Sequence, residues 1–411
     1  MNLELFIARR LLKGDKTGTV SVPIVKIALI GIALGVCVML LSVFVITGFK
    51  KEITTKLSGF TAHLNITAYE NNNSYAGSDI QLNDSLVTEI RSLPEVKQVY
   101  AYVTKPAILK SKEEIHGVIL KGMDSLYQSG FYKKHLLAGQ YPDFTSDTVS
   151  NDILISAAVA GLLNIKTGNR ISAHFVQDPP RVRVFTIRGI YDTGFKEYDD
   201  MFVICDMRHL QRLNGWGGKQ VSGLGVELQD MHNITLTEWK IDEILPVEED
   251  EDFYKITTLR ETAPQVFDWL NLLNMNVWII LTLIVVVAGF NMVSGLLILI
   301  LDKTSLIGIL KALGYKNICL RRLFLYIAIG LIGRGMVAGN ILALLLAGVQ
   351  YYFRIIKLDA ATYYMDTVPI HFDLFYMLLL NAGVLIVSVL MLIIPTMLIS
   401  RIRPIKAIRF E

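Results

Sequence analysis

Residues 277–317 read VWIILTLIVVVAGFNMVSGLLILILDKTSLIGILKALGYKN, and this stretch decides the fold. Its first part, Val277–Leu301, carries no charge, and a helix needs about 20 apolar residues to cross roughly 30 Å of hydrocarbon. A short segment with separated charges and a glycine follows, and another apolar stretch begins at Leu323. The pattern predicts two membrane-spanning helices that are joined by a short amphipathic helix.

The composition of the whole chain agrees with several apolar segments. Of its 411 residues, 52% are hydrophobic and 19% are charged, which is too apolar for an ordinary soluble protein of this length. Because lipid offers backbone groups no hydrogen-bond partner, a helix is the expected form of each segment. We predict an integral membrane α-helical protein whose four transmembrane helices lie at residues 24–48, 275–301, 319–349 and 374–400.

The first apolar segment has a rival interpretation as a cleaved signal peptide. Its apolar core, Ile24–Ile46, is too long for one, and the following VITGFKKE offers no small-x-small cleavage site. We expect a retained anchor.

Lysine and arginine gather on one side of the predicted spans. That side carries Arg9, Arg10, Lys13, Lys16, Lys26, Lys303, Lys311, Lys316, Arg321, Arg322, Arg401, Arg403, Lys406 and Arg409. The other side carries Lys50, Lys51, Lys56, Arg260, Arg354 and Lys357. Since positive residues favour the cytoplasmic side, both termini are predicted to be cytoplasmic. Residues 49–274 would form a large periplasmic domain, and residues 350–373 a short periplasmic loop.

The large polar region reads as a mixed α+β domain. We predict strands at 62–69, 96–103, 115–122, 181–191, 222–229 and 252–259, a strand, short helix and strand within 152–176, and helices at 83–94 and 235–245. We expect the first and last units to pair as one subdomain, with 104–215 inserted between them. The stretch ETAPQVFDWLNLLNMNVW (261–278) is expected to continue as a helix into the second span. A single cysteine, Cys205, excludes an internal disulfide in this domain.

Motifs for catalysis are missing from the sequence. KGDKTG (13–18) lacks the upstream glycine of a phosphate-binding loop, and neither H-E-x-x-H nor C-x-x-C occurs. We predict no catalytic residue, no metal site, no cofactor held by this chain and no nucleic-acid partner. Any energy input must then come from another protein.

The segment after the second span separates charges from an apolar stripe, which consists of Leu306, Ile309, Leu310 and Leu313. Asp302 or Thr304 is expected to cap the helix start, and Gly314 to end it in the left-handed conformation. A plain interfacial connector is the alternative. The residues predicted to form this element are Asp302, Lys303, Ser305, Leu306, Ile309, Leu310, Lys311, Leu313 and Gly314.

Several stretches resemble one family. FNMVSGLLILILDKTSLIGILKALGYKN (290–317) is similar to the signature of FtsX-like permeases of ABC transporters, although Leu306 stands where glutamate is usual. PPRVRVFTIRGIYDTGFKEYDDMFVICDMRHLQRL (179–213) and YYMDTVPIHFDLFY (363–376) resemble the lipoprotein-releasing (Lol-type) members. LELFIARRLL (3–12) and RPIKAIRFE (403–411) resemble the ends of those proteins.

The resemblance implies a permease subunit of an ATP-driven complex in the inner (cytoplasmic) membrane. Such complexes release lipoproteins from that membrane to a periplasmic carrier. Residues 1–23 would form a cytoplasmic amphipathic elbow helix, 302–318 a coupling helix, and 401–411 a cytoplasmic tail. The implied partners are a cytoplasmic ABC ATPase that binds ATP and Mg, a second permease chain of the same or another kind, the carrier, the lipoprotein substrate and membrane lipid.

The resemblance also implies two contact regions. Apolar residues of the first two spans would line a cavity for acyl chains, namely Val36, Leu40, Val43, Val286 and Phe290. The hairpin HFVQDPPRVRVF (174–185) would contact the carrier through Gln177, Asp178, Pro179, Pro180, Arg181 and Arg183. The alternatives are ordinary helix packing for the first set and a solvated hairpin for the second.

Polar residues within the predicted spans require an explanation. Arg334 costs at least about 2.5–3.5 kcal/mol at a helix centre, so we expect it to face protein, a wet cavity or a partner. Asn291 and Asn381 are expected to form hydrogen bonds between helices. Gly31 and Gly35 form a G-x-x-x-G that predicts a packing face, which a second permease could cover.

Two other functions stay open from the sequence. One is a related exporter permease for a peptide, toxin or antibiotic. The other is a non-transport transmembrane regulator of cell-wall hydrolases, although those proteins usually have a much smaller exported domain.

Overall fold

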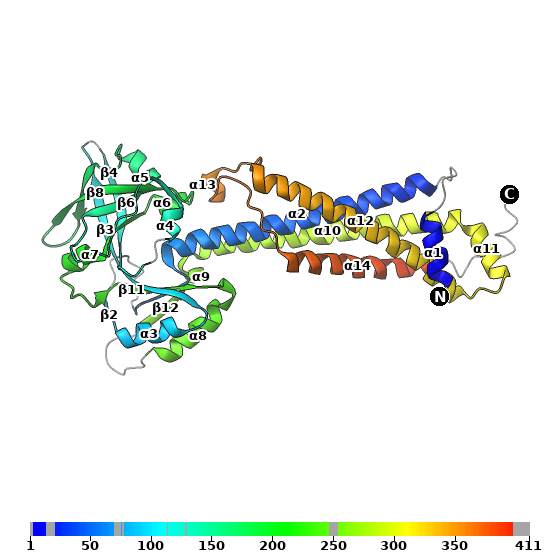
Figure 1. Ribbon diagram of the computed structural model, residues 1–411, viewed down its shortest axis with the longest axis horizontal. Coiled ribbons are helices and arrows are strands. Elements are labelled where there is room, and N and C mark those ends of the chain that lie inside the picture. Colours follow the sequence, from blue (N-terminus) through cyan, green and yellow to red (C-terminus); the bar gives the residue numbers. More distant parts are fainter. Residues whose placement is uncertain are drawn as a thin grey trace. The chain divides into compact units, whose positions relative to one another are not determined.

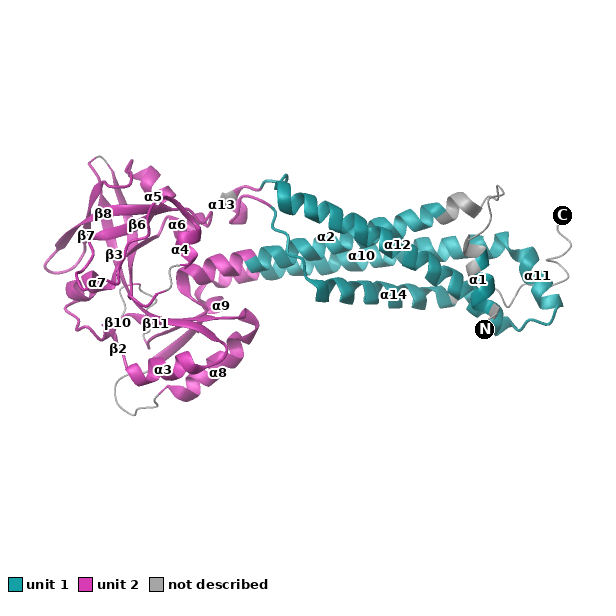
Figure 2. Ribbon diagram, in the orientation of Figure 1, with its two compact units in different colours: residues 1–51, 269–357, 368–411 teal, residues 52–268, 358–367 magenta. Residues whose placement is uncertain are grey.

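The computed structural model describes residues 3–13, 21–69, 75, 78–112, 114–127, 130–245 and 254–397. Figure 2 shows that the chain divides into two compact units. Residues 1–51, 269–357 and 368–411 form the helical unit, and residues 52–268 and 358–367 form the mixed domain.

The helical unit contains α1 (Leu3–Lys13), most of α2 (Ser21–Thr61) and of α10 (Pro264–Asp302), α11 (Thr304–Ala312), α12 (Asn317–Phe353) and α14 (Leu374–Thr396). Residues 52–61 of α2 and 264–268 of α10 belong to the mixed domain. Within the described part of the chain, four of these helices are long and apolar enough to cross a membrane, as the sequence predicts: α2, α10, α12 and α14. The expected tail at 401–411 lies outside the described residues.

Three of these helices are longer than the apolar segments that predicted them. α2 starts at Ser21 and continues to Thr61, α10 begins at Pro264, and α12 ends at Phe353. Hydropathy marks where apolar residues stop, whereas a helix ends where its hydrogen-bond ladder ends. Of the stretch 261–278 that was expected to continue into the second span, the part from Pro264 onward does so as α10. Residues 261–262 belong to a separate short helix, Leu259–Thr262.

Glycines bring α12 close to α2 in the core of the helical unit. A Cβ atom at Gly339 would lie 2.5 Å from the carbonyl oxygen of Ala33, and one at Gly335 would lie 2.8 Å from Ile32. Small residues at such contacts allow helix backbones to approach closely. Gly31 and Gly35 instead face Asn291 and Ile284 of α10. The G-x-x-x-G residues thus form a packing face, as the sequence predicts, and the helix that covers it is α10 of the same chain rather than a second permease.

The segment before α14 is held against α2. The His371 N–H donates to the Phe44 carbonyl oxygen at 3.1 Å, and a Cβ at Gly48 would lie 2.5 Å from the Pro369 carbonyl oxygen. Gln350, which is buried, donates to the carbonyl oxygens of Ile356 and Val368, both at 3.2 Å. These bonds fix the two ends of the connection between α12 and α14, residues 354–357 and 368–373, in the helical unit.

The strands of the mixed domain are β1 (Leu64–Ala68), β2 (Ile80–Gln81), β3 (Val96–Lys110), β4 (Ile115–Met123), β5 (Leu136–Gly139), β6 (Asp152–Ser156), β7 (Arg170–Phe175), β8 (Arg181–Tyr191), β9 (Phe202–Asp206), β10 (Gln220–Val221), β11 (Gly223–Leu228) and β12 (Tyr254–Thr258). The helices are α3 (Asp84–Ser92), α4 (Gly130–Lys134), α5 (Ala157–Leu162), α6 (Lys196–Asp199), α7 (Met207–Asn214), a 3-10 turn at Met231–Asn233, α8 (Ile234–Ile244), α9 (Leu259–Thr262) and α13 (Ala360–Tyr363). The strands and helices predicted from alternation and capping are confirmed, with ends shifted by a few residues except at β3, which runs seven residues past its predicted end at residue 103.

One half of the mixed domain is an antiparallel sheet in the order β12-β1-β11-β3. We call it the α/β half. Helices α3 and α8 lie side by side against one face of it (Figure 1). Their side chains Leu86, Ile90 and Ile241 share a core with Leu64 and Ile66 of β1. The sheet thus has one face buried by helices and one face that they leave open.

The other half is a barrel. Strand β3 pairs with β4, β4 with β9, β9 with β6, β6 with β8, β8 with β7, and β7 returns to β3. The ring therefore closes, and we call it the barrel half. Because β3 continues from Val96 to Lys110 through both halves, residue 104 of the expected insertion at 104–215 lies inside a strand.

Candidate functional site

Helix α11 exposes apolar side chains at the end of the helical unit. Ile307 is fully buried in the core of the unit, whereas Ile309 is 49% and Leu313 is 78% exposed. The side chain that packs inward is Ile307, which lies outside the predicted stripe. Leu306 and Leu310 are half-buried. The exposed pair forms an apolar surface that a protein partner could cover.

The start of α11 differs from the predicted cap. Lys303 is the N-cap residue, without a side-chain cap bond, and its Nζ lies 3.1 Å from Asp302 Oδ2. Thr304 Oγ1 donates to the Ile300 carbonyl oxygen at 3.1 Å. Asp302 and Thr304 do not cap α11, because α10 runs to Asp302 and its last turn supplies the nearby acceptors. The prediction for Gly314 is confirmed, since its φ is +84°.

The residues expected to line an acyl-chain cavity fall into two groups. Val36 and Leu40 are 1% and 0% exposed in the core of the helical unit, so the expectation that they face acyl chains is wrong for this conformation. They pack inward because glycines of α12 let that helix approach their side of α2. Val43 is half-buried, and Val286 and Phe290 are exposed.

The polar residues of the spans differ in burial and in hydrogen bonding. Asn340 and Asn381 exchange two hydrogen bonds of 2.8 and 3.0 Å between α12 and α14, which confirms the expected role of Asn381. Asn291 is exposed on α10 and lies beside Gly31. Arg334 is exposed although the neighbouring Gly335 packs on α2. Its side chain therefore does not enter the core of the helical unit.

The predicted contact hairpin is formed by β7 and β8, with Phe175 opposite Arg181. Gln177 Nε2 and Arg181 Nη1 donate to the carbonyl oxygens of Leu213 and Arg212, at 3.5 and 3.4 Å. These bonds attach the hairpin to the end of α7. Its tip and first strand residues are exposed, namely Val176, Asp178, Pro179, Pro180, Arg181, Val182, Arg183 and Val184.

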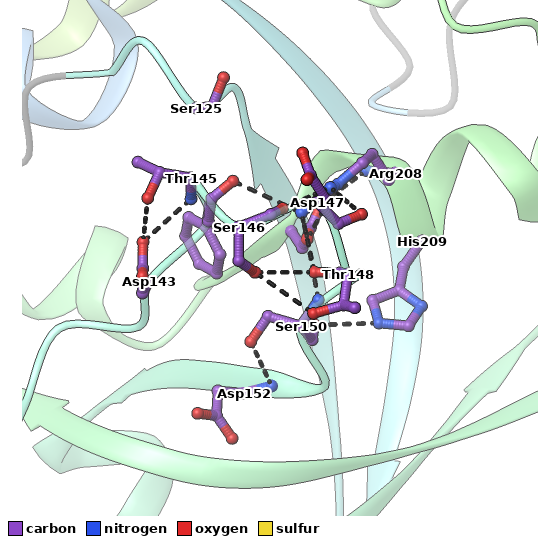
Figure 3. Close-up of polar contacts among 12 residues, drawn as sticks. Ser125, Asp143, Thr145, Ser146, Asp147, Thr148, Ser150, Asp152, Arg208 and His209 are labelled. Atoms are coloured by element: carbon purple, nitrogen blue, oxygen red, sulfur yellow. Dashed lines mark hydrogen bonds and ion pairs between the residues drawn. The ribbon is translucent and has the colours of Figure 1, made fainter.

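Figure 3 shows the polar network that fixes the start of α7. Asp206 is 1% exposed and caps α7 by accepting from the Arg208 N–H at 2.9 Å. Its carboxylate also accepts from Arg208 Nη2 at 2.6 Å and from the Ser150 N–H at 3.0 Å. Arg208 Nη1 donates to the Ser146 carbonyl oxygen at 2.8 Å. One guanidinium thus joins α7 to the loop before β6.

Replacing Arg208 with methionine is expected to destabilise the mixed domain by about 2 kcal/mol, because a buried carboxylate loses its charged donor. Unfolding of the full chain in nanodiscs, followed by pulse proteolysis, measures the change. Arg188→Met is the matched control, since Arg188 Nε lies 3.8 Å from Asp152 Oδ2 and the two side chains are 53% and 34% exposed. Equal losses in the two variants would contradict the role of the network.

The end of α2 is embedded in the mixed domain. Phe60 is fully buried, and its ring lies 5.4 Å from Phe131, 6.1 Å from Tyr132, 5.4 Å from Tyr198 and 6.0 Å from Phe202, centroid to centroid. Aromatic pairs at these separations attract beyond their area burial. The last turns of α2 are therefore firmly held by the barrel half.

A buried cation extends this attachment to the loop before α14. Lys56 is 6% exposed, and its Nζ donates to the Tyr364 carbonyl oxygen at 3.1 Å. The Tyr364 ring lies 4.7 Å from Phe195. Burial lowers the pKa of Lys56, and the charges of Glu52, Asp366, Asp199 and Asp192 act in the opposite direction. Two chain segments that enter the mixed domain thus meet at one charged contact.

Asp199 belongs to the same contact and titrates unusually. Its carboxylate accepts from the Thr193 N–H at 3.1 Å and Oγ1 at 2.9 Å. Burial nevertheless raises the pKa of Asp199 from 3.8 to about 6, while Thr193 and Lys56 lower it. Because the folded-state pKa is the higher one, the stability that Asp199 contributes is present below about pH 3.8 and is lost as pH rises through about 6.

The wild-type chain is therefore expected to lose about 1 kcal/mol of unfolding free energy between pH 5 and pH 7, relative to Asp199→Asn. Pulse proteolysis at a series of pH values checks this difference. The exposed Asp242→Asn is the control, and its profile should follow that of wild type. Parallel profiles for wild type and Asp199→Asn would contradict the prediction.

Several of these residues were not anticipated from the sequence. Phe60 and Lys56 lie after the apolar segment of α2, where hydropathy indicates only the end of a span. The absence of proline from residues 49–61 is the feature of the sequence that could have predicted the continuation of this helix. Asn340, the partner of Asn381, lies in the third apolar stretch, six residues after Arg334. The sequence does not show that Asn340 meets Asn381, because that contact depends on how α12 packs on α14.

Comparisons with known proteins define the class. The model of the MacB-like periplasmic core domain matches residues 27–244, and the FtsX-like permease C-terminal model matches residues 278–404. The chain therefore belongs to the FtsX-like permeases with a MacB-like periplasmic core domain. This confirms the resemblance that was inferred from residues 290–317.

Individual relatives are similar to this chain over nearly its whole length. The lipoprotein-releasing system transmembrane protein LolC of Neisseria meningitidis serogroup B is 26% identical, with all of both chains covered. LolC of Xylella fastidiosa is 25% identical over 100% of this chain and 99% of its own, and LolE of Haemophilus influenzae is 20% identical over 98% of each. The solved periplasmic region of MacB from Actinobacillus actinomycetemcomitans is 16% identical and covers 52% of this chain and 95% of its own, with a TM-score of 0.36.

Proposed function

We propose that this chain is the permease subunit of an ATP-driven complex that releases lipoproteins from the inner membrane to a periplasmic carrier. The observation that carries the proposal is the full-length similarity to proteins named LolC and LolE, at 20–26% identity. The chain itself plays a mechanical role. A cytoplasmic ATPase partner binds ATP and Mg and hydrolyses the nucleotide.

The arrangement of α11 supports a connection to that ATPase. The helix is fastened to the helical unit by Ile307 and presents Ile309 and Leu313 outward. Because its buried side is packed in the helical unit, α11 would move together with that unit when a partner binds to its exposed side. In this proposal α2, α10, α12 and α14 cross the inner membrane, both termini are cytoplasmic, and the mixed domain is periplasmic.

The mixed domain then transfers motion and contacts the carrier. The end of α2 is held at Phe60, and the loop containing Tyr364 is held at Lys56. The β7–β8 hairpin carries Arg181 and Arg183, which can pair with an acidic carrier surface. Exposed Val286 and Phe290 of α10 remain the proposed contacts for acyl chains.

Purification of the tagged chain from its native membrane tests this function. We expect an ATPase with a phosphate-binding loop, a second permease copy or relative, and an acylated protein to be recovered together. Reconstituted with these partners in liposomes, the complex should release the acylated protein to the carrier only when ATP is hydrolysed. Release without ATP hydrolysis, or recovery of an outer-membrane tunnel without acylated cargo, would overturn the proposal.

Arg334 gives a prediction for the membrane part of this cycle. Arg334→Leu is expected to leave expression and folding intact, because the side chain lies outside the core of the helical unit. Release of lipoprotein should fall about tenfold, since an ionisable residue within a span marks a site of contact with substrate, headgroup or partner in this proposal. Release assays in liposomes measure the change, with Arg334→Lys as the conservative control. Unchanged release in Arg334→Leu would exclude a role of Arg334 in lipoprotein release.

A further inference from the structure

The mixed domain contains a cleft that the proposed release function does not use. Its volume is about 530 Å³, which falls within the range of small-molecule sites. The lining residues used below are Asn65, Thr67, Tyr102, Lys121, Lys255 and Thr257. We call this the Lys121 cleft. It lies entirely within the mixed domain.

One wall of the cleft is the open face of the α/β half. In the register of β1 and β12, Asn65 lies opposite Thr257, and Thr67 lies opposite Lys255. The alternate residues Leu64 and Ile66 belong to the apolar core on the helix-covered face. The cleft wall is therefore a compact block of hydroxyl, amide and ammonium groups. Such groups hydrogen-bond a polar ligand, whereas an apolar one would leave them without partners.

The lining of the cleft also includes a buried lysine. Lys121 on β4 is 3% exposed, its Nζ donates to the Phe60 carbonyl oxygen at 2.6 Å, and the same atom lies 4.6 Å from the centre of the Tyr102 ring. Among the residues that the structure describes, no carboxylate forms an ion pair with it. Burial lowers the pKa of Lys121 to about 7, and the charge of Glu227 acts in the opposite direction. Glu227 itself is paired with Lys97 at 3.4 Å.

The charges of the lining favour an anion. Glu261 also lines the cleft, but its Oε2 accepts from the Thr258 N–H at 2.9 Å and from Thr258 Oγ1 at 3.1 Å. Its charge is thus directed at the start of α9. When Lys121 is protonated, the ammonium groups of Lys121 and Lys255 outnumber the carboxylate of Glu261 by one positive charge, which a monoanion balances. A buried ammonium is costly until it is paired, so an anion that reaches Lys121 gains affinity from a group already in place.

We propose that the Lys121 cleft binds a small carboxylate ligand, of about the size of a sugar acid or a short peptide end, with the Lys121 ammonium as its charged contact. The hydroxyl and amide groups of β1 and β12 then hydrogen-bond the rest of the ligand. A carboxylate matches the single excess charge better than a phosphate dianion does. Either a sugar acid or a peptide C-terminus supplies this chemistry.

Calorimetric titration of the full chain in detergent tests the site. The probes are D-glucuronate and N-acetyl-L-alanine, each with a neutral counterpart, D-glucose and N-acetyl-L-alanine amide. We expect at least one carboxylate to bind the wild-type chain about tenfold more tightly than its neutral counterpart. The probe that binds identifies the source as a sugar acid or a peptide end.

Variants separate ligand binding from folding. Lys121→Met should weaken the carboxylate about tenfold or more, while the exposed Lys166→Met binds as wild type does. Thr257→Val, which alters only the polar wall, should also weaken binding, and it serves if Lys121→Met fails to fold. Equal binding of charged and neutral probes, no binding of either carboxylate to wild type, or unchanged affinity in Lys121→Met or Thr257→Val would overturn the proposal.

Discussion

Replacing Ile309 and Leu313 together with aspartate is expected to reduce ATP-driven release by about 100-fold or more. Both side chains are exposed, at 49% and 78%, so the chain itself should fold as before. In the proposed complex they are buried against the ATPase. Full burial of such a side chain contributes about 1.5–3 kcal/mol, and two lost contacts correspond to about 100-fold or more in association.

Two measurements check this result. Pull-down of the ATPase by the tagged chain measures association, and ATP-dependent release in liposomes measures coupling. Leu162→Asp is the matched control, because Leu162 on α5 is 54% exposed and lies in the mixed domain. It should leave both readouts unchanged. Normal ATPase binding and release in the double variant would show that the exposed side of α11 is not the contact.

The second large effect is expected in the core of the helical unit. Gly339→Val should destabilise it by about 3 kcal/mol, at the upper end of overpacking costs, because the new Cβ meets the Ala33 backbone rather than a movable side chain. The expected signs are a lower melting temperature and loss of a single species in size-exclusion chromatography of the detergent-solubilised chain.

Gly333→Val provides the comparison for Gly339→Val. Gly333 lies on the same helix, α12, yet a Cβ there meets nothing within 4 Å. The same substitution at this position should change stability little, which removes helix propensity as the explanation. A similar loss at both positions would mean that the close approach of α2 and α12 is not what requires Gly339.

The sequence predicts the elements better than their connections. Charge-free segments located the long helices, and alternation located strands such as β8, because each signal is local to the residues that produce it. Strand β9 and helix α7 were passed over, since residues 202–214 combine a short apolar run with a polar helix. Closure of the barrel half was not predictable, because it depends on the pairing of β7 with β3, which lies far from it in sequence.

The candidate site shows the same division. Gly314 could be assigned as the end of α11 because the left-handed conformation that often follows a helix is adopted most readily by glycine. The exposed side of α11 could not be assigned from the sequence. Leu306, Ile307, Ile309, Leu310 and Leu313 are all apolar, and only the packing of the helical unit decides that Ile307 is the one that is fully buried. The buried cations Lys56 and Lys121 were likewise invisible, because lysine is ordinarily a surface residue and tertiary structure alone covers it.

Strand β3 has a further consequence if the mixed domain transmits motion as proposed. Among the strands that the structure describes, it alone lies in both halves of the mixed domain, with β11 along its first part and β7 along its last. Pulling the halves apart along this strand would strain many parallel bonds at once in shear rather than opening them one by one. The domain should therefore resist stretching as a single stiff body and pass a displacement onward with little loss.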